Sequence, residues 1–196
     1  MGLAAVRGRL LSLGEDEEAA VAVAREALAA FEARFQAAHL AGLRRKLGLS
    51  TEREGDAGLA RDLLQVMAEN GADFTVAFRR LSDAAAGPEG DAGVRALFSE
   101  PGAYDAWAPR WRQRLADEAV APEARRAAMR AGSPAYIPRN HLVEAALAAA
   151  VERGDLGPFE ELLAVVSRPY EERPGLGRYA EPPRPEERVL QTFCGT

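Results

Sequence analysis

The sequence predicts an all-α protein, an array of about seven or eight helices followed by an irregular, proline-rich carboxyl-terminal tail. Three observations support this prediction. Apolar residues recur at spacings of three and four through most of the chain, which is the periodicity of an amphipathic helix. No segment combines sustained apolar and polar alternation with β-branched side chains, so we expect almost no strand. Five prolines follow residue 168, and they disfavour regular structure in the tail.

The amino-terminal half of the chain is expected to hold three helices. The first runs from residue 15 to about residue 47, with acidic residues at its start, basic residues at its end and Gly48 closing it. Asp56 is expected to cap the second helix and Asp73 the third, because an aspartate side chain accepts hydrogen bonds from the first backbone amides. The apolar face of the first helix comprises Val21, Ala24, Leu28, Phe31 and Phe35.

The carboxyl-terminal half is expected to hold the remaining helices and then the tail. Asn140 is expected to cap a helix over residues 141–153, which the letters "GD" end, and Pro158 opens the last helix. Shorter helices are expected at residues 94–99, at residues 104–118 and from Pro122 onward. We therefore divide the chain into a helical region, residues 1–168, and an extended proline-rich tail, residues 169–196.

Composition argues against several classes of function. The chain has 30 acidic residues against 25 lysines and arginines, a formal net charge of −5, which disfavours non-specific binding to nucleic acid. A single cysteine excludes an internal disulfide framework and a cysteine-based zinc cluster. The sequence shows neither an apolar run of membrane-spanning length nor a signal-peptide pattern. We therefore expect no membrane partner and a cytoplasmic location.

The residues themselves suggest no nucleotide, metal or catalytic site. The glycine-rich segment "GPEGDAG", residues 87–93, lacks the lysine of a phosphate-binding loop and carries two acids that would repel phosphate. His39 and His141 have no second histidine or cysteine at metal-ligand spacing, so structural roles are expected for both. We accordingly assign no catalytic, cofactor-binding or metal-binding residue in this chain.

Two features remain for which more than one role is open. Tyr104, Trp107 and Trp111 fall at spacings of three and four, and such an aromatic stripe is usually core or an interdomain contact. Cys194, the single cysteine, lies third from the carboxyl terminus in "VLQTFCGT". A thiol there could be redox-active or could have no role.

Several segments closely resemble the carboxyl-terminal part of the selenoprotein O family, also called SelO or YdiU. The longest is "SPAYIPRNHLVEAALAAAVERGDLGPFEELLAVVSRPYEERP", residues 133–174, which departs from the family pattern at Ser133 and Ala135. "ADFTVAFRRL", "WAPRWRQRL" and "RYAEPPRPEERVLQTFCGT" are similar to further family segments. The matching positions of the longest segment are Tyr136, Arg139, Asn140, Leu142, Gly154, Asp155, Leu162, Leu163, Pro169, Tyr170, Glu172 and Pro174.

The resemblance implies the carboxyl-terminal portion of a protein adenylyltransferase. Members of this family resemble protein kinases and transfer AMP from ATP to protein hydroxyls with Mg²⁺ or Mn²⁺. Their catalytic and ATP-binding residues belong to an amino-terminal kinase-like region that this chain does not resemble, so we carry none of them over. We expect a fragment that is inactive alone, whose partners are the missing kinase-like lobe and, in the intact family, protein substrates. Tyr104, Trp107 and Trp111 are the predicted interdomain face.

The resemblance also gives Cys194 a role. Eukaryotic members carry selenocysteine third from the end, and the family implicates this position in redox control through a disulfide to the kinase-like domain. This chain has no second cysteine, so the expected partner is another molecule or the missing segment. Two other readings stay open: a stand-alone helical interaction module, and a thiol-redox protein acting through Cys194.

Overall fold

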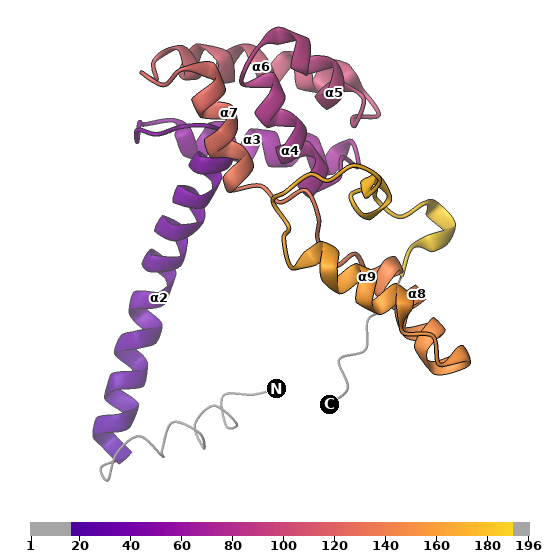
Figure 1. The fold of residues 1–196 in the computed structure, drawn as a ribbon. Helices are drawn as coiled ribbons and strands as arrows, with labels where there is room; N and C mark the ends of the chain where they lie inside the picture. The colour runs from indigo at the N-terminus through magenta and orange to yellow at the C-terminus, as the bar shows by residue number, and fades with distance from the viewer. Residues whose placement is uncertain (1–16, 190–196) are drawn as a thin grey trace. The chain divides into compact units, whose positions relative to one another are not determined.

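The structure, a computed structural model, describes residues 17–189. Over this part of the chain it contains eight α-helices and no strand, which confirms the predicted all-α class (Figure 1). The helices are α2 (Glu17–Lys46), α3 (Asp56–Glu69), α4 (Phe74–Ala84), α5 (Asp91–Arg95), α6 (Pro101–Ala116), α7 (Pro122–Ala131), α8 (Asn140–Arg153) and α9 (Gly157–Val166). Short 3₁₀ turns are η2 (Pro88–Gly90), η3 (Gly177–Tyr179) and η4 (Pro185–Glu187).

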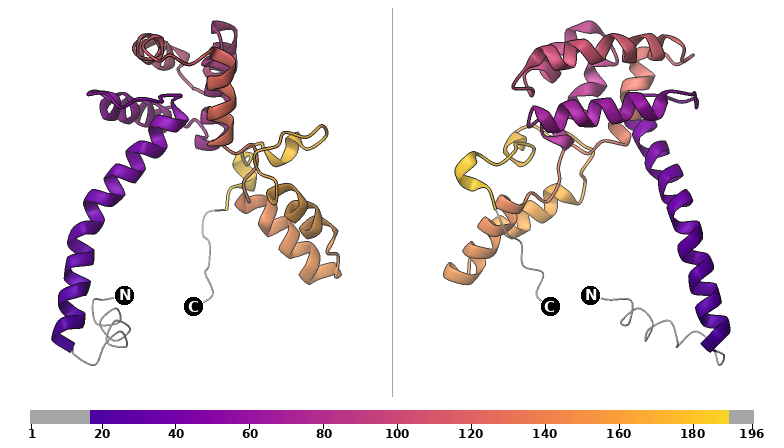
Figure 2. Two further views of the ribbon diagram at one scale, coloured as in Figure 1. Left: turned by 60° about the vertical axis from the view of Figure 1, so that its left-hand side comes forward. Right: turned by 180° about the vertical axis from the view of Figure 1, so that it is seen from behind.

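The chain divides into two compact units, the first ending at Gly42 and the second beginning at Leu43. The first unit contains most of α2, a long single helix in every view (Figure 2). The second unit contains the last turn of α2, the other seven helices and the segment after residue 168. The predicted division at residue 168 therefore falls inside the second unit.

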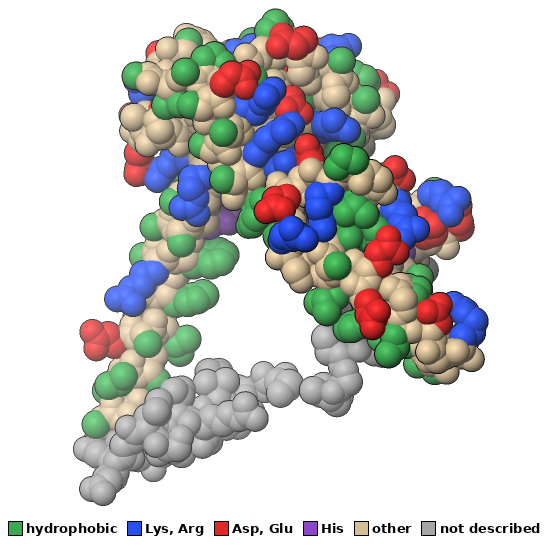
Figure 3. Space-filling model, in the orientation of Figure 1, with side chains coloured by type: hydrophobic (Ala, Val, Ile, Leu, Met, Phe, Trp, Pro, Cys, Tyr) green, Lys and Arg blue, Asp and Glu red, His purple; other side chains and the backbone are tan. Residues whose placement is uncertain are grey.

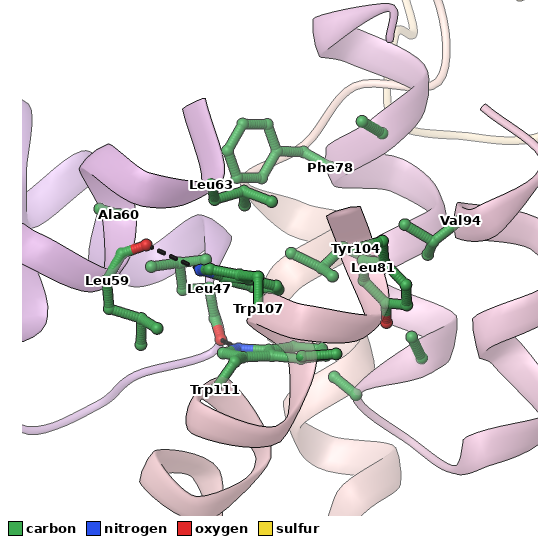
Figure 4. Close-up of a cluster of buried hydrophobic side chains, with 14 of the residues drawn as sticks. Leu47, Leu59, Ala60, Leu63, Phe78, Leu81, Val94, Tyr104, Trp107 and Trp111 are labelled. Atoms are coloured by element: carbon green, nitrogen blue, oxygen red, sulfur yellow. Dashed lines mark hydrogen bonds between the residues drawn. The ribbon is translucent and has the colours of Figure 1, made fainter. Parts of the chain in front are cut away.

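Within residues 43–189, the second unit has two hydrophobic cores. The larger one is built by the last turn of α2 and by helices α3 to α7, with Trp107 and Trp111 among its fully buried side chains (Figure 4). The smaller core is formed by α9, by the segment before α8 and by the segment after α9. It contains Tyr136, Val165 and Tyr179. Because Tyr179 lies in a 3₁₀ turn beyond the last helix, part of the proline-rich segment belongs to this core.

The predicted helix ends agree with the structure at three sites. Gly48 adopts a left-handed φ of 75° after α2, and a Cβ placed there would lie 2.8 Å from the Met129 sulfur. Gly154, with a φ of 64°, ends α8 in the same way. Asp73 caps α4, because its Oδ1 accepts a hydrogen bond of 2.9 Å from the Val76 amide.

Two predicted caps are wrong. Gly55 occupies the cap position of α3 at a φ of 94°, and the Asp56 carboxylate instead accepts a 2.9 Å hydrogen bond from the Arg53 amide. Asn140 is the first residue of α8, and Arg139 precedes it in an extended conformation. The carbonyl of Arg139 accepts the first helical bonds, so the helix starts one residue earlier than predicted.

Helices α5 and α6 begin earlier than the sequence predicted. The 3₁₀ turn that begins at Pro88 runs directly into α5, which therefore covers residues 91–95 instead of 94–99. Pro101 occupies the first turn of α6, where its missing amide hydrogen costs nothing, so α6 starts three residues before Tyr104.

Candidate functional site

Segments that resemble the family, far apart in the sequence, meet in the second unit at a cluster of charged side chains. Arg79 of α4 is buried, and its guanidinium donates to four acceptors. Glu172 Oε1 accepts at 2.9 Å, and the carbonyl oxygens of Ser133 and Tyr170 accept at 3.0 and 3.3 Å. The fourth acceptor is the carbonyl oxygen of Arg130 at 3.1 Å. We call Asp73, Arg79, Tyr136, Arg139 and Glu172 the arginine junction.

Arg139 forms the second half of the arginine junction. Its guanidinium binds both oxygens of Asp73, at 2.9 and 3.1 Å, and donates a further 2.8 Å hydrogen bond to the Ala180 carbonyl. Burial alone would raise the pKa of Asp73, but hydrogen bonds from Arg139 and the Val76 amide outweigh burial and lower it. The carboxylate that caps α4 therefore also anchors the start of α8 and, through Arg139, the segment after α9.

Tyr136 completes the arginine junction. Its hydroxyl accepts a 3.0 Å hydrogen bond from the Arg173 amide, and the Arg173 guanidinium lies 5.9 Å from its ring centroid. A half-open cavity of about 410 Å³ lies beside these residues and is also lined by Arg79, Arg80 and Glu172. Arg79 pairs with Glu172 at its wall, so this cavity is not a purely cationic site. The geometry fixes residues 169–180 against α4, α8 and α9.

A second buried charge network connects α6 to the loop before α3. Arg114 binds Asp56 Oδ1 at 2.8 Å and Glu118 Oε1 at 2.6 Å. Glu118 also accepts hydrogen bonds from the backbone amides and hydroxyls of Ser50 and Thr51. Burial alone would raise the pKa of Glu118, but the bonds from Ser50, Thr51 and Arg114 outweigh burial and lower it to about 2.

Replacing Glu118 with glutamine is expected to lower stability at neutral pH but hardly at all near pH 2. A depressed folded-state pKa contributes stability above the usual carboxyl value of 4.5, and that contribution is lost as pH falls toward 2. The expected difference in unfolding free energy between wild type and Glu118→Gln is about 3 kcal/mol at pH 6. Urea denaturation at several pH values measures it, and a difference that stays constant with pH would contradict the assignment.

The three aromatic residues of the predicted interdomain face lie in the larger core. Tyr104, Trp107 and Trp111 are each at most 2% exposed. The indole of Trp107 donates to the Leu59 carbonyl at 3.0 Å, and that of Trp111 to the Leu47 carbonyl at 2.9 Å (Figure 4). Their rings pack against helices of this same chain. This is the core role, one of the two roles expected for such an aromatic stripe. A contact with another domain stays a prediction.

Other predicted site residues are placed as follows. Cys194 lies outside the described residues, so its redox role stays a prediction. His39 stacks on Phe35, with ring centroids 5.8 Å apart. In residues 17–189 no three histidine, cysteine or acidic side chains are grouped so that they could hold a metal ion. Over the same range, no helix has the length and apolarity that a membrane span requires.

The buried arginines are structural residues that the sequence pattern alone did not indicate. Arg79, Arg125 and Arg139 are each at most 8% exposed, although arginine is mostly found at protein surfaces. Arg125 donates to the carbonyls of Leu115 and Val120 at 3.0 and 3.1 Å. The resemblance to the family could have indicated two of them, because Arg79 lies in the family-like segment "ADFTVAFRRL" and Arg139 in "AYIPRN".

Comparison with known proteins identifies the class. Residues 12–167 match the family model described as "Protein adenylyltransferase SelO", so the chain belongs to the SelO family. It is similar to "Protein nucleotidyltransferase YdiU" of Bradyrhizobium sp. strain BTAi1, with 59% identity over 183 residues. The proteins of the same name from Rhodopseudomonas palustris strain BisB5 and Methylorubrum extorquens strain PA1 are 56% and 55% identical. These alignments cover 93–94% of this chain but only 37–38% of the relatives.

Proposed function

We propose that this chain is the helical carboxyl-terminal part of a SelO-type protein adenylyltransferase. In the intact enzyme, AMP would pass from ATP to hydroxyl groups of protein substrates with the help of Mg²⁺ or Mn²⁺. The observation that carries the proposal is the alignment, in which 93% of this chain matches only 37% of a protein named as a nucleotidyltransferase. The remaining length of such a relative is where the kinase-like, ATP-binding portion would lie.

The role proposed for the chain is architectural. The arginine junction and the buried Arg114–Glu118 pair fix one arrangement of the second unit, because each buried charge has acceptors or donors at short distance. A rigid helical body of this kind would support an attached catalytic portion without contributing reacting groups. By this proposal, the chain alone does not transfer AMP.

A chimera tests the proposal. The matched segment of the Bradyrhizobium relative is replaced by this chain, and AMP incorporation from labelled ATP is measured with Mg²⁺ or Mn²⁺. The chimera is expected to transfer AMP, whereas this chain alone and the relative without its matched segment are not. Transfer by the isolated chain would overturn the proposal, as would a folded but inactive chimera.

A further inference from the structure

One face of α2 displays large apolar side chains where a stable helix would usually bury them. Leu28, Phe31 and Phe35 are 63%, 63% and 51% exposed, and they lie three and four residues apart on one side of the helix. The rings of Phe31 and Phe35 stack on each other with centroids 5.8 Å apart. In Figure 3, hydrophobic side chains project in a row along one side of α2. We call Leu28, Phe31, Phe35 and His39 the α2 row.

The α2 row continues into a buried surface. From Phe31, steps of four residues lead through Phe35 and His39 to Leu43 and Leu47, which belong to the larger core and are 7% and 0% exposed. The same row of one helix is therefore core at its carboxyl-terminal end and exposed over the preceding three turns. Scattered exposed apolar residues are normal, but a contiguous row with stacked rings marks an interaction surface.

The length of the relatives indicates the occupant. About 37% of each relative matches this chain, so most of the relative's length lies outside it. The resemblance to the carboxyl-terminal part of the family places that missing length before α2. Elements that are consecutive along a chain usually pack against one another, so the absent portion that precedes this chain in the relatives is the nearest candidate.

We propose that the α2 row is the docking surface for the amino-terminal portion of the SelO-type protein, and that Phe31 and Phe35 are its central contacts. This inference rests on the function proposed above. The partner surface would be apolar, because the row offers two phenyl rings and a leucine and the stacked imidazole of His39.

Amide hydrogen exchange within α2 tests the proposal, using the chimera with the Bradyrhizobium relative and the isolated chain. In the chimera, residues 28–39 are expected to exchange at least tenfold more slowly than in the isolated chain. Phe31→Ala/Phe35→Ala is expected to remove at least tenfold of that protection. Phe35→Ala alone supplies the same readout if the double variant does not fold. Val23→Ala is the matched control, because Val23 is 66% exposed on the same helix but lies off the row.

The outcomes separate the two proposals. An active chimera whose α2 exchange is unaffected by the double substitution would overturn the docking proposal and leave the proposed function standing. A folded but inactive chimera would overturn the proposed function, whatever the rate of amide exchange in α2. Sedimentation velocity of the isolated chain tests whether a second copy of this chain binds the α2 row instead. A dimer that the double substitution dissociates would overturn the docking proposal.

Discussion

Replacing Trp111 with alanine is expected to lower the free energy of unfolding by about 3–5 kcal/mol. The Trp111 side chain is fully buried and stacks on Trp107 with ring centroids 5.4 Å apart. Its removal would leave a large cavity in the core and would deprive the Leu47 carbonyl of the indole donor at 2.9 Å. Urea denaturation of the isolated chain, followed by helical circular dichroism, measures the loss.

Phe35→Ala is the matched control for Trp111→Ala, since both changes remove an aromatic ring. Phe35 is 51% exposed in this structure, so its replacement in the isolated chain is expected to change the unfolding free energy by less than about 0.5 kcal/mol. If Trp111→Ala were equally harmless, the ring would not be a core residue of this chain. The interdomain role predicted from the aromatic stripe would then be the better explanation.

Helices were largely predictable because their signals are local. Apolar spacing, proline at first turns and glycine after last turns depend on residues within one or two turns. The two wrong caps show the limit of this reasoning. Asp56 and Asn140 have suitable side chains, but the carboxylate of Asp56 is engaged by Arg114 of another helix at 2.8 Å. A capping preference of about 1 kcal/mol is easily overridden by such a buried ion pair.

The arginine junction was not predictable from the residues because its partners are distant in the sequence. Arg79 meets Glu172, 93 residues away, and the carbonyl of Ser133, 54 residues away. The pattern of side chains along the sequence does not show which backbone carbonyls of irregular segments will accept hydrogen bonds. From local sequence alone, these arginines would therefore be placed at the solvent-exposed surface. The exposed α2 row was predictable as an apolar face, yet the sequence alone does not distinguish a buried face from an uncovered one.

Replacing Arg79 with methionine is expected to lower the free energy of unfolding by about 3–5 kcal/mol, because it removes the buried guanidinium that satisfies three backbone carbonyls and the half-exposed carboxylate of Glu172. Methionine retains much of the side-chain volume, but Glu172 and the carbonyls of Arg130, Ser133 and Tyr170 would lose their shared donor. Urea denaturation measures this loss. Arg79→Lys is expected to be intermediate, because an ammonium keeps the charge but cannot reproduce the planar guanidinium's several directed bonds.

The Arg79 substitution is also expected to loosen the segment after α9 before the larger core unfolds. Tyr179 is 4% exposed in the smaller core, so chymotrypsin should cleave after it slowly in the wild type and much faster in Arg79→Met. Arg153→Met, at an exposed arginine near the end of α8, is the control and should cleave at the wild-type rate. Unchanged cleavage after Tyr179 in Arg79→Met would mean that Arg139 and the smaller core hold residues 169–180 without Arg79. The two halves of the arginine junction would then act independently, whereas faster cleavage would show that Arg79 is required to hold the segment in place.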